Sequence, residues 1–318
     1  MNKYKQFGFS NTKKMLAAAL CGGYAVPAYN FSNAETLRAI LTACAQTKSP
    51  VILQVSPGAL NYIGADILIP MVVSYIKKYA KNLRGRVALH LDHGTDFATC
   101  KKCIDMGFSS VMIDASKKSF DENIKITRRV TQYAKKFNVS VEGELGQLGI
   151  EKDKKQCDES VFTNPNDAKI FVEKTGVDSL AVSIGTSHGV YKLETPNHKL
   201  RFDILVELER TLKNFPLVLH GASGVQKNII TKINKFGGKI QGANGMSSAN
   251  LIRAREMNVC KINIDSDARL AFTMGIRESL ARHPDNFDPR VFMTSAIDAM
   301  IKLYTDKNIK IMGSANKI

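Results

Sequence analysis

The sequence of 318 residues predicts an α/β protein, a (β/α)8 TIM barrel in a single domain spanning residues 1–318. Eight apolar runs with strand character alternate with helical patterns, as parallel strands and crossover helices do. The runs are apolar almost throughout, which indicates burial on both faces. An open, doubly wound sheet is the alternative. The barrel is favoured because no G-x-G-x-x-G motif follows the first strand and because polar residues gather at the C-terminal ends of the runs.

A leading helix precedes the strands. It spans Asn11 to Cys21, with Asn11 as its N-cap and Gly22 and Gly23 at its end, and we expect it to cover the N-terminal end of the barrel. The eight strands are expected at Tyr24 to Asn30, Val51 to Ser56, Arg86 to His93, Ser110 to Ala115, Val139 to Leu145, Ser179 to Thr186, Leu217 to Ser223 and Cys260 to Asp265.

The segments between the strands carry the spacing of amphipathic helices. These helices are expected at Asn33 to Thr47, Ile69 to Lys81, Asp96 to Met106, Phe120 to Phe137, Asp167 to Thr175, Phe202 to Lys213, Asn228 to Phe236 and Ala249 to Met257, and an extra C-terminal helix at Arg290 to Lys307.

Composition narrows the classes of function. With 44% hydrophobic residues and a net charge of +16, the chain can bury a core and favours an anionic partner: nucleic acid, an anionic membrane or a phosphorylated metabolite. No apolar run reaches the ~18 residues of a membrane span, and the lysine-rich patches lack interleaved aromatic residues that would stack on bases. Six cysteines in a long chain without an export signal indicate reduced thiols, so we expect a cytoplasmic protein.

Three histidines stand at the ends of three different predicted strands. His93, His188 and His220 are far apart in the chain, so that only a barrel brings them together. Three imidazoles around an open fourth position are the ligand set of a catalytic zinc site. His90 is expected to be structural within its strand, and no role is expected for His198 and His283.

Three carboxylates accompany these histidines. Asp114 and Glu144 stand at the ends of the next two strands, where they would bind a second or displaced cation or orient the imidazoles. Asp92 stands directly before His93, within reach of a substrate held on the metal, which suits a general acid or base.

Two turns after the seventh and eighth strands are predicted to bind phosphate, because barrels often do so at this place through backbone N–H groups and hydroxyls. A second anion is expected between Ser56 and Arg269. Cys100 and Cys103 form a C-x-x-C pattern within a predicted outer helix, and we interpret them as two incidental thiols because no second pair occurs. The two turns are Gly221, Ala222, Ser223 and Gly224, and Asn263, Ile264, Asp265 and Ser266.

Taken together, these strand ends resemble the class II, zinc-dependent fructose-bisphosphate aldolases along essentially the whole chain. The segments that carry the resemblance are Val26 to Phe31, His90 to Gly94, Val141 to Gly146, Gly185 to Gly189, Leu219 to Ser223 and Lys261 to Asp267. The resemblance implies cleavage of fructose 1,6-bisphosphate to dihydroxyacetone phosphate and glyceraldehyde 3-phosphate, and the reverse condensation. It also implies a homodimer or homotetramer with neither nucleic acid nor membrane as a partner.

The resemblance assigns roles to the individual positions. His93, His188 and His220 match the Zn²⁺ ligands, and Asp114 and Glu144 match an alternative or second metal position, with room for a monovalent cation. Asp92 matches the proton donor of the condensation, and Glu151 the mobile glutamate that exchanges the proton on the ketose carbon. The expected contacts to dihydroxyacetone phosphate are Gly189, Gly221, Ala222, Ser223, Asn263, Ile264, Asp265 and Ser266, and those to the other half of the substrate are Ser56, Asp265 and Arg269.

The sequence departs from the family pattern in two places, and two alternative functions remain open. Ser266 replaces the usual threonine but keeps the hydroxyl, and the loop from Gly149 to Lys155 is short and rich in lysine, which affects the placement of Glu151. The alternative within the family is a tagatose-bisphosphate aldolase, whose substrate differs from fructose 1,6-bisphosphate in the configuration at C4. The segment from Gly237 to Asn250 is more similar to the fructose-specific members. A zinc hydrolase on the same barrel is the alternative of another class, and it requires a zinc-bound water as the nucleophile.

Overall fold

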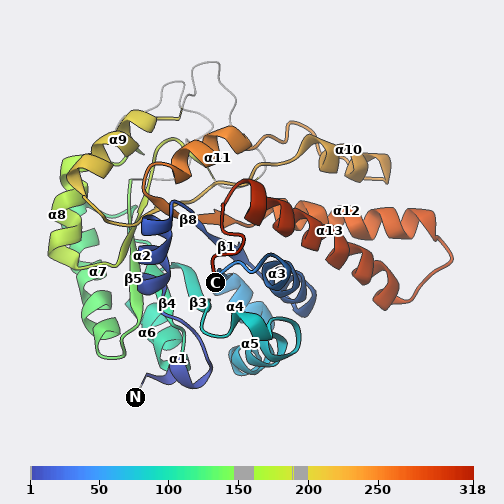
Figure 1. The fold of residues 1–318 in the computed structure, drawn as a ribbon, viewed down its shortest axis with the longest axis horizontal. Helices are drawn as coiled ribbons and strands as arrows, with labels where there is room; N and C mark the ends of the chain where they lie inside the picture. The colour runs from blue at the N-terminus through green and yellow to red at the C-terminus, as the bar shows by residue number, and fades with distance from the viewer. Residues whose placement is uncertain (1, 147–160, 188, 190–199) are drawn as a thin grey trace.

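Eight parallel strands close into a barrel in chain order in the computed structural model, which describes residues 2–146, 161–187, 189 and 200–318 (Figure 1). The first strand pairs with both the second and the eighth, and Val26 lies opposite Lys261 where the barrel closes. This confirms the predicted (β/α)8 barrel over the open sheet. The strands are β1 (Val26–Asn30), β2 (Val51–Val55), β3 (Val87–Gly94), β4 (Ser110–Ile113), β5 (Ser140–Leu145), β6 (Ser179–Val182), β7 (Leu217–Leu219) and β8 (Val259–Ile264).

The outer layer consists of helices that cover the barrel, together with an arm of helices that extends beyond it (Figure 1). The helices are α1 (Lys3–Gln6), α2 (Thr12–Gly22), α3 (Ala34–Thr47), α4 (Pro57–Ile63), α5 (Ala65–Tyr79), the 3-10 helix η1 (Lys81–Leu83), α6 (Phe97–Met106), α7 (Phe120–Lys135), α8 (Pro165–Thr175), α9 (Phe202–Thr211), α10 (Lys227–Lys235), α11 (Ser248–Arg255), α12 (Ser266–Arg282) and α13 (Pro289–Lys310).

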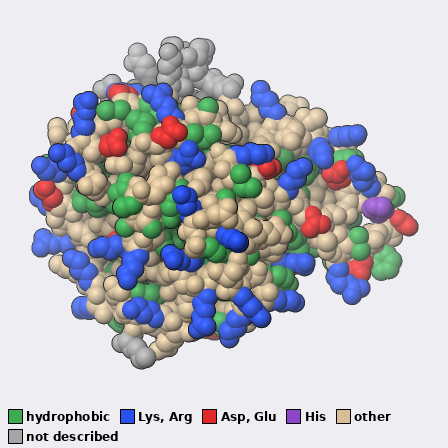
Figure 2. Space-filling view, in the orientation of Figure 1, with side chains coloured by type: hydrophobic (Ala, Val, Ile, Leu, Met, Phe, Trp, Pro, Cys, Tyr) green, Lys and Arg blue, Asp and Glu red, His purple; other side chains and the backbone are tan. Residues whose placement is uncertain are grey.

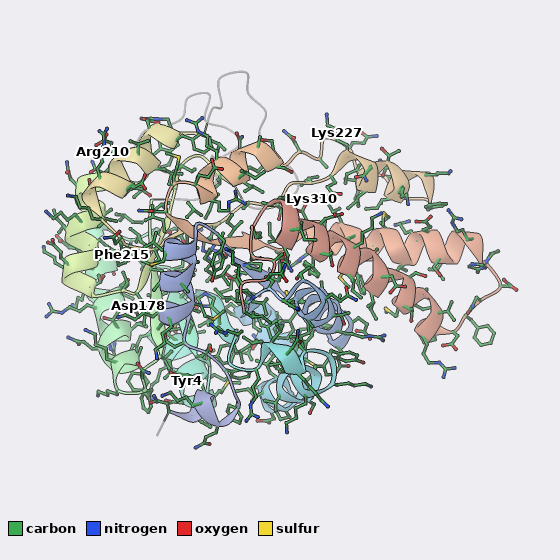
Figure 3. The ribbon with its side chains drawn as sticks, in the orientation of Figure 1. Tyr4, Asp178, Arg210, Phe215, Lys227 and Lys310 are labelled. Carbon is green, nitrogen blue, oxygen red and sulfur yellow. The ribbon has the colours of Figure 1, made fainter. Side chains whose placement is uncertain are left out.

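Helix α2 closes the N-terminal end of the barrel, as predicted. Asn11 caps it by accepting a hydrogen bond from the amide of Lys13, and Gly23 ends it in the left-handed conformation. Met15, Leu16 and Ala19 pack against inward-facing strand residues that include Val26 and Ala28. Asp178, which directly precedes β6 and is labelled in Figure 3, forms an ion pair of 2.9 Å with Lys13 of this helix. At the opposite end, described residues line a cavity.

Four helices differ from the sequence prediction. Helices α1, α4 and α12 were not predicted, and α5 begins at Ala65 rather than at Ile69, so that Pro70 lies inside it. Burial of Leu68, Ile69 and Val72 holds the helix together although the proline lacks an amide donor. Helix α12 was not predicted, because it packs against both α10 and α13 and has no single apolar stripe.

Helices α12 and α13 form the arm that extends away from the barrel (Figure 1). They approach so closely that a Cβ atom on Gly275 would lie 2.6 Å from the Cα atom of Ala296. The ion pair between Asp267 and Lys307, with an Oδ2–Nζ distance of 2.6 Å, is buried at the base of the arm. The arm is thereby fixed to the end of β8, where the predicted phosphate site lies.

The surface bears scattered positive charge. On the face shown in Figure 2, lysine and arginine side chains lie over many elements and do not gather into one stripe. Among the described helices, none has by itself both the length and the apolar character to cross a bilayer. Helices α4 and α5 reach that threshold only when counted together, and they meet at an angle of 87°.

Candidate active site

A bulge at the end of β3 directs two consecutive residues toward the same site. Neighbouring side chains of a strand normally point to opposite faces. Here the register between β3 and β4 shifts between Leu91 and Gly94, and His93 has a positive φ of 50°. The shift brings Asp92 and His93 to the same cavity at the open end of the barrel. Gly94 is required beside them, since a Cβ atom there would lie 2.5 Å from the carbonyl oxygen of Met112.

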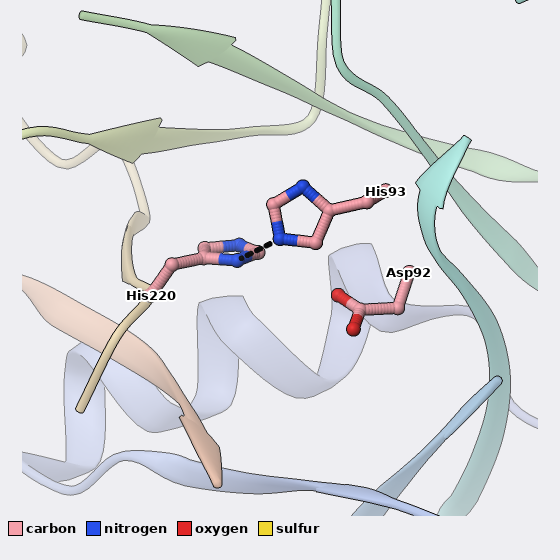
Figure 4. Close-up of side chains that lie close together, drawn as sticks. All are labelled: Asp92, His93 and His220. Atoms are coloured by element: carbon pink, nitrogen blue, oxygen red, sulfur yellow. Dashed lines mark hydrogen bonds between the residues drawn. The ribbon is translucent and has the colours of Figure 1, made fainter. Parts of the chain in front are cut away.

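His93 and His220 face each other across the barrel (Figure 4). Nε2 of His93 lies 3.0 Å from Nδ1 of His220. The far nitrogen of each ring contacts a carboxylate: Nδ1 of His93 is 2.9 Å from Asp114 Oδ2, and Nε2 of His220 is 2.8 Å from Glu142 Oε1. A carboxylate accepts the proton of the far nitrogen and so leaves the near nitrogen as a metal ligand.

Asp92 is buried beside this pair and is held by two amides. Asn30 Nδ2 donates to Oδ2 over 2.7 Å, and Asn263 Nδ2 donates to Oδ1 over 3.2 Å. Burial acts to raise the pKa of Asp92, but the electrostatic interactions with His93, His220 and Lys261 and the hydrogen bond from Asn30 outweigh it and lower the pKa. Asp92 is therefore a carboxylate at neutral pH and accepts protons rather than donating them.

The charge of His93 is set by the carboxylates around it. Burial alone would lower its pKa, but the hydrogen bond to Asp114 and the charges of Asp92 and Glu144 raise the pKa to about 9. Asp114 is affected in the opposite direction: burial raises its pKa, and the bonds from His93 and Ser116 outweigh this and lower the pKa well below its usual range. For Glu144, burial and the neighbouring Asp114 raise the pKa well above its usual value.

The donor set fits a divalent cation. Asp92, His93 and His220 offer ligand atoms within 4.8 Å of one another, and so do His93, Asp114 and Glu144. Among the described residues, Oε2 of Glu144 is buried without a hydrogen-bond partner, as expected for an atom that contacts an ion. Imidazole nitrogens with carboxylate oxygens are ligands that zinc accepts.

A cavity of about 280 Å³ opens beside the two histidines. Gly221 in its wall has a φ of 62°, and a Cβ atom there would lie 2.7 Å from the carbonyl oxygen of Ser187, so only glycine allows the loops after β6 and β7 to meet. The described residues that line the cavity are Asn30, Ser56, Asp92, His93, Ser187, Gly189, His220, Gly221, Ala222, Ser223, Asn263, Asp265, Ser266 and Arg269.

The two expected anion sites lie in this one cavity, with two exceptions. Gly224 does not line it, and its amide donates to Asp267 Oδ2 over 2.8 Å. Ile264 does not line the cavity either, because this residue alternates with Asn263 and Asp265 along the chain and its side chain packs in the outer hydrophobic core. Any contact of Ile264 with a ligand is thus left to its backbone. Arg269 reaches the cavity from α12, where its Nε donates to Asp265 Oδ1 over 2.8 Å.

Two of the residues expected in the site, His188 and Glu151, lie outside the described residues. Asp114 and Glu144 lie behind His93, away from the cavity lining. Cys100 and Cys103 are buried in α6, and burial raises the pKa of Cys103 to about 12. Their thiols are therefore not ionised at neutral pH, which fits the expectation of incidental residues.

Several polar residues of the barrel interior were not expected from the sequence. Asn30 is the last residue of β1 and contacts Asp92, and Gln54 Nε2 in turn donates to Asn30 Oδ1 over 3.0 Å. Glu142 and Lys261 lie within β5 and β8, nearly inaccessible to solvent. A signal was present, since an ionisable residue inside an otherwise apolar strand requires a buried partner.

Comparisons with known proteins agree over the length of the chain. A family model described as "Fructose-bisphosphate aldolase class-II" matches residues 10–317. Proteins named fructose-bisphosphate aldolase from Treponema pallidum and Giardia intestinalis are 46% and 44% identical; the first match covers 100% of both chains, the second 95% of this chain and 92% of the relative. The solved YdjI aldolase of Escherichia coli K12 is similar, with a TM-score of 0.77 at 27% identity, covering 97% of this chain and 99% of that one.

Proposed function

The chain belongs to the class II fructose-bisphosphate aldolase family, and from this premise we propose which residues bind the metal, transfer protons and bind the phosphates. The protein is a lyase that cleaves fructose 1,6-bisphosphate to dihydroxyacetone phosphate and glyceraldehyde 3-phosphate and catalyses the reverse condensation. The family is metal-dependent. The observation that carries the assignment of roles is the pair of imidazoles whose near nitrogens lie 3.0 Å apart, beside the ionised Asp92.

The metal site is proposed to consist of His93 Nε2 and His220 Nδ1, with His188 as the third ligand. In both described rings the far nitrogen lies at hydrogen-bond distance from a carboxylate, so that the rings are oriented before a metal binds. A Zn²⁺ ion bound there supplies Lewis-acid stabilisation of the negative charge that develops on the substrate carbonyl oxygen during cleavage.

Asp92 is proposed to move the proton on the C4 hydroxyl. In cleavage its carboxylate accepts that proton while the electron pair of the C3–C4 bond remains on the dihydroxyacetone phosphate half. In condensation it returns the proton to the aldehyde oxygen. The amides of Asn30 and Asn263 hold both carboxylate oxygens, so that this group is oriented before the substrate arrives. Glu151 is proposed to deliver the proton to C3.

The two phosphates are proposed to bind at opposite ends of the cavity. Gly189, the turn from Gly221 to Ser223 and the segment from Asn263 to Ser266 would hold the dihydroxyacetone phosphate half, with backbone amides and hydroxyls as donors. Ser56 and Arg269 would hold the other phosphate, and Asp265 orients Arg269. Holding both ends fixes the reacting bond relative to Asp92.

Further expectations accompany this assignment. Asp114 and Glu144 would hold an alternative or second cation, and a monovalent cation would bind nearby. Oε2 of Glu144, which has no hydrogen-bond partner within the described part of the chain, supports this. We propose a homodimer or homotetramer in the cytoplasm, with the phosphorylated sugar as partner rather than nucleic acid or a membrane. On the face shown in Figure 2, the positive charge is scattered, which supports a small anion over nucleic acid as the partner.

The test is metal analysis combined with an aldolase assay on the purified protein. We expect bound zinc, cleavage that chelation abolishes and zinc restores, and a higher turnover with fructose than with tagatose 1,6-bisphosphate. A preference for the tagatose substrate would favour the alternative specificity. Zinc-dependent hydrolysis without carbon–carbon cleavage would overturn the proposal in favour of a hydrolase.

A further inference from the structure

A charged cluster lies inside the barrel, below the two facing histidines. It consists of Glu142 on β5, Lys261 on β8 and His90 on β3, with side chains only 1–2% exposed. Lys261 Nζ lies 2.8 Å from Glu142 Oε2, and Glu142 Oε1 lies 2.8 Å from His220 Nε2. A buried pair of this kind is costly to desolvate and contributes little to stability by itself. Its contact with a proposed metal ligand suggests another use.

The contacts of Glu142 allow one arrangement of protons. The ammonium group of Lys261 has only donors, so it occupies Oε2 as a donor and leaves Glu142 a pure acceptor. Oε1 must then accept the Nε2 proton of His220. A neutral imidazole carries one proton, and its lone pair is therefore on Nδ1, the atom that faces His93 Nε2.

The contacts of His90, on the opposite side of the cluster, specify its proton position in the same way. Lys261 Nζ approaches His90 Nε2 at 3.5 Å, and His90 Nδ1 lies 2.8 Å from Ser110 Oγ. Nε2 of His90 can only accept from the ammonium, so Nδ1 carries the proton and donates to the serine. Burial and the charge of Lys261 lower the pKa of His90 well below its usual value, in agreement with a neutral ring. The orientation of Lys261 is thus fixed from two sides.

We propose that Glu142, held by Lys261, is a positioning residue that sets the tautomer and the orientation of His220 so that Nδ1 binds the metal. The inference rests on the proposed role of His220 as a ligand. A positioning role differs from a purely structural one in its consequence for the metal. If Glu142 and Lys261 only stabilised the fold, apolar residues could replace both without any change at the metal.

The first experiment examines the unmodified, zinc-loaded protein. Long-range ¹H–¹⁵N spectra of the histidine rings distinguish a protonated ring nitrogen from one that binds a metal. We expect His220 to show a protonated Nε2 and a metal-bound Nδ1, with its signals assigned by their loss in His220→Ala. A protonated Nδ1 would overturn the proposal, and this measurement needs no variant of the buried pair to fold.

The second experiment compares two double variants that both remove the buried charges. In Glu142→Gln with Lys261→Met, the amide oxygen of the glutamine can still accept from His220 Nε2. The amide nitrogen then points toward His90 Nε2, which lies 3.8 Å from Oε2 of Glu142 in the unmodified protein. Glu142→Leu with Lys261→Met removes the acceptor. We expect the leucine variant to bind zinc about 10- to 100-fold more weakly than the glutamine variant, and its cobalt-substituted form to show an altered visible spectrum.

The outcomes separate this proposal from the function on which it rests. Equal zinc affinity and equal cobalt spectra in the two double variants would overturn the positioning role, provided that His220→Ala weakens zinc binding. If His220→Ala keeps its zinc, the assignment of the ligand fails, and with it the proposed metal site. Thermal unfolding of each variant identifies any loss of affinity that follows from misfolding.

Discussion

Replacing Asp92 with asparagine tests the central proton transfer. The change is nearly isosteric, but Asn30 and Asn263 both present amide donors to this position. An asparagine accepts with only one of its two terminal atoms, so one hydrogen bond to a charged acceptor is lost, about 1.5–3 kcal/mol of stability. Because the pKa of Asp92 is lowered, the base is fully ionised at neutral pH and the variant loses its whole contribution.

The expected result is a fall in kcat for cleavage of about 10²- to 10⁴-fold, which corresponds to about 2.7–5.5 kcal/mol in the activation free energy. Zinc content should not change. A coupled assay for dihydroxyacetone phosphate measures the rate, and hydrogen–deuterium exchange at C3 of dihydroxyacetone phosphate in heavy water serves as the control. Asp92→Asn should retain this exchange, whereas Glu151→Gln should lose it together with turnover.

Two results would refute the reasoning. A cleavage rate close to that of the unmodified enzyme would show that another group takes the C4 proton. Exchange that is lost in Asp92→Asn but retained in Glu151→Gln would reverse the two roles.

Three further predictions follow from the site. Borohydride added with the substrate should leave no lasting inhibition, because the reaction needs a metal and no lysine Schiff base; a ketose trapped on any lysine would contradict this. Arg269→Ala should weaken binding of the bisphosphate about 10- to 100-fold, in line with a lost charge-assisted contact of about 1.5–3 kcal/mol, and binding of dihydroxyacetone phosphate far less, as measured by inhibition constants; equal losses would show that the arginine is misassigned. In the chelated protein the raised pKa of His93, about 9, contributes stability that is fully present below its unfolded value of about 6.5 and is lost as pH rises toward 9. The melting temperature should therefore fall across this interval, and Asp114→Asn should flatten the fall; an equal slope in both proteins would exclude the His93–Asp114 pair as its source.

Much of the fold could be predicted because its signals are local. Eight apolar runs that alternate with helical stripes indicate parallel strands with covered faces. The polar residues at the ends of these runs favoured the closed barrel over an open sheet, and the structure shows that barrel. Helix α12 was not predicted from the sequence. It packs against α10 on one side and α13 on another, so its apolar residues do not form a single face. Helix α5 begins at Ala65 rather than at the expected Ile69, because burial of Leu68 and Ile69 outweighs the hydrogen bond that Pro70 cannot donate.

The order of residues along the chain specifies which side chains stand at the ends of the strands, and therefore that imidazoles, carboxylates and glycines meet on one face of a barrel. How they meet depends on contacts between distant parts of the chain. The bulge that turns Asp92 and His93 to the same side depends on the pairing of β3 with β4. The contact of Glu142 with His220 joins residues 78 positions apart. Proton positions and ring orientation follow from such distant partners, and no local pattern of residues encodes them.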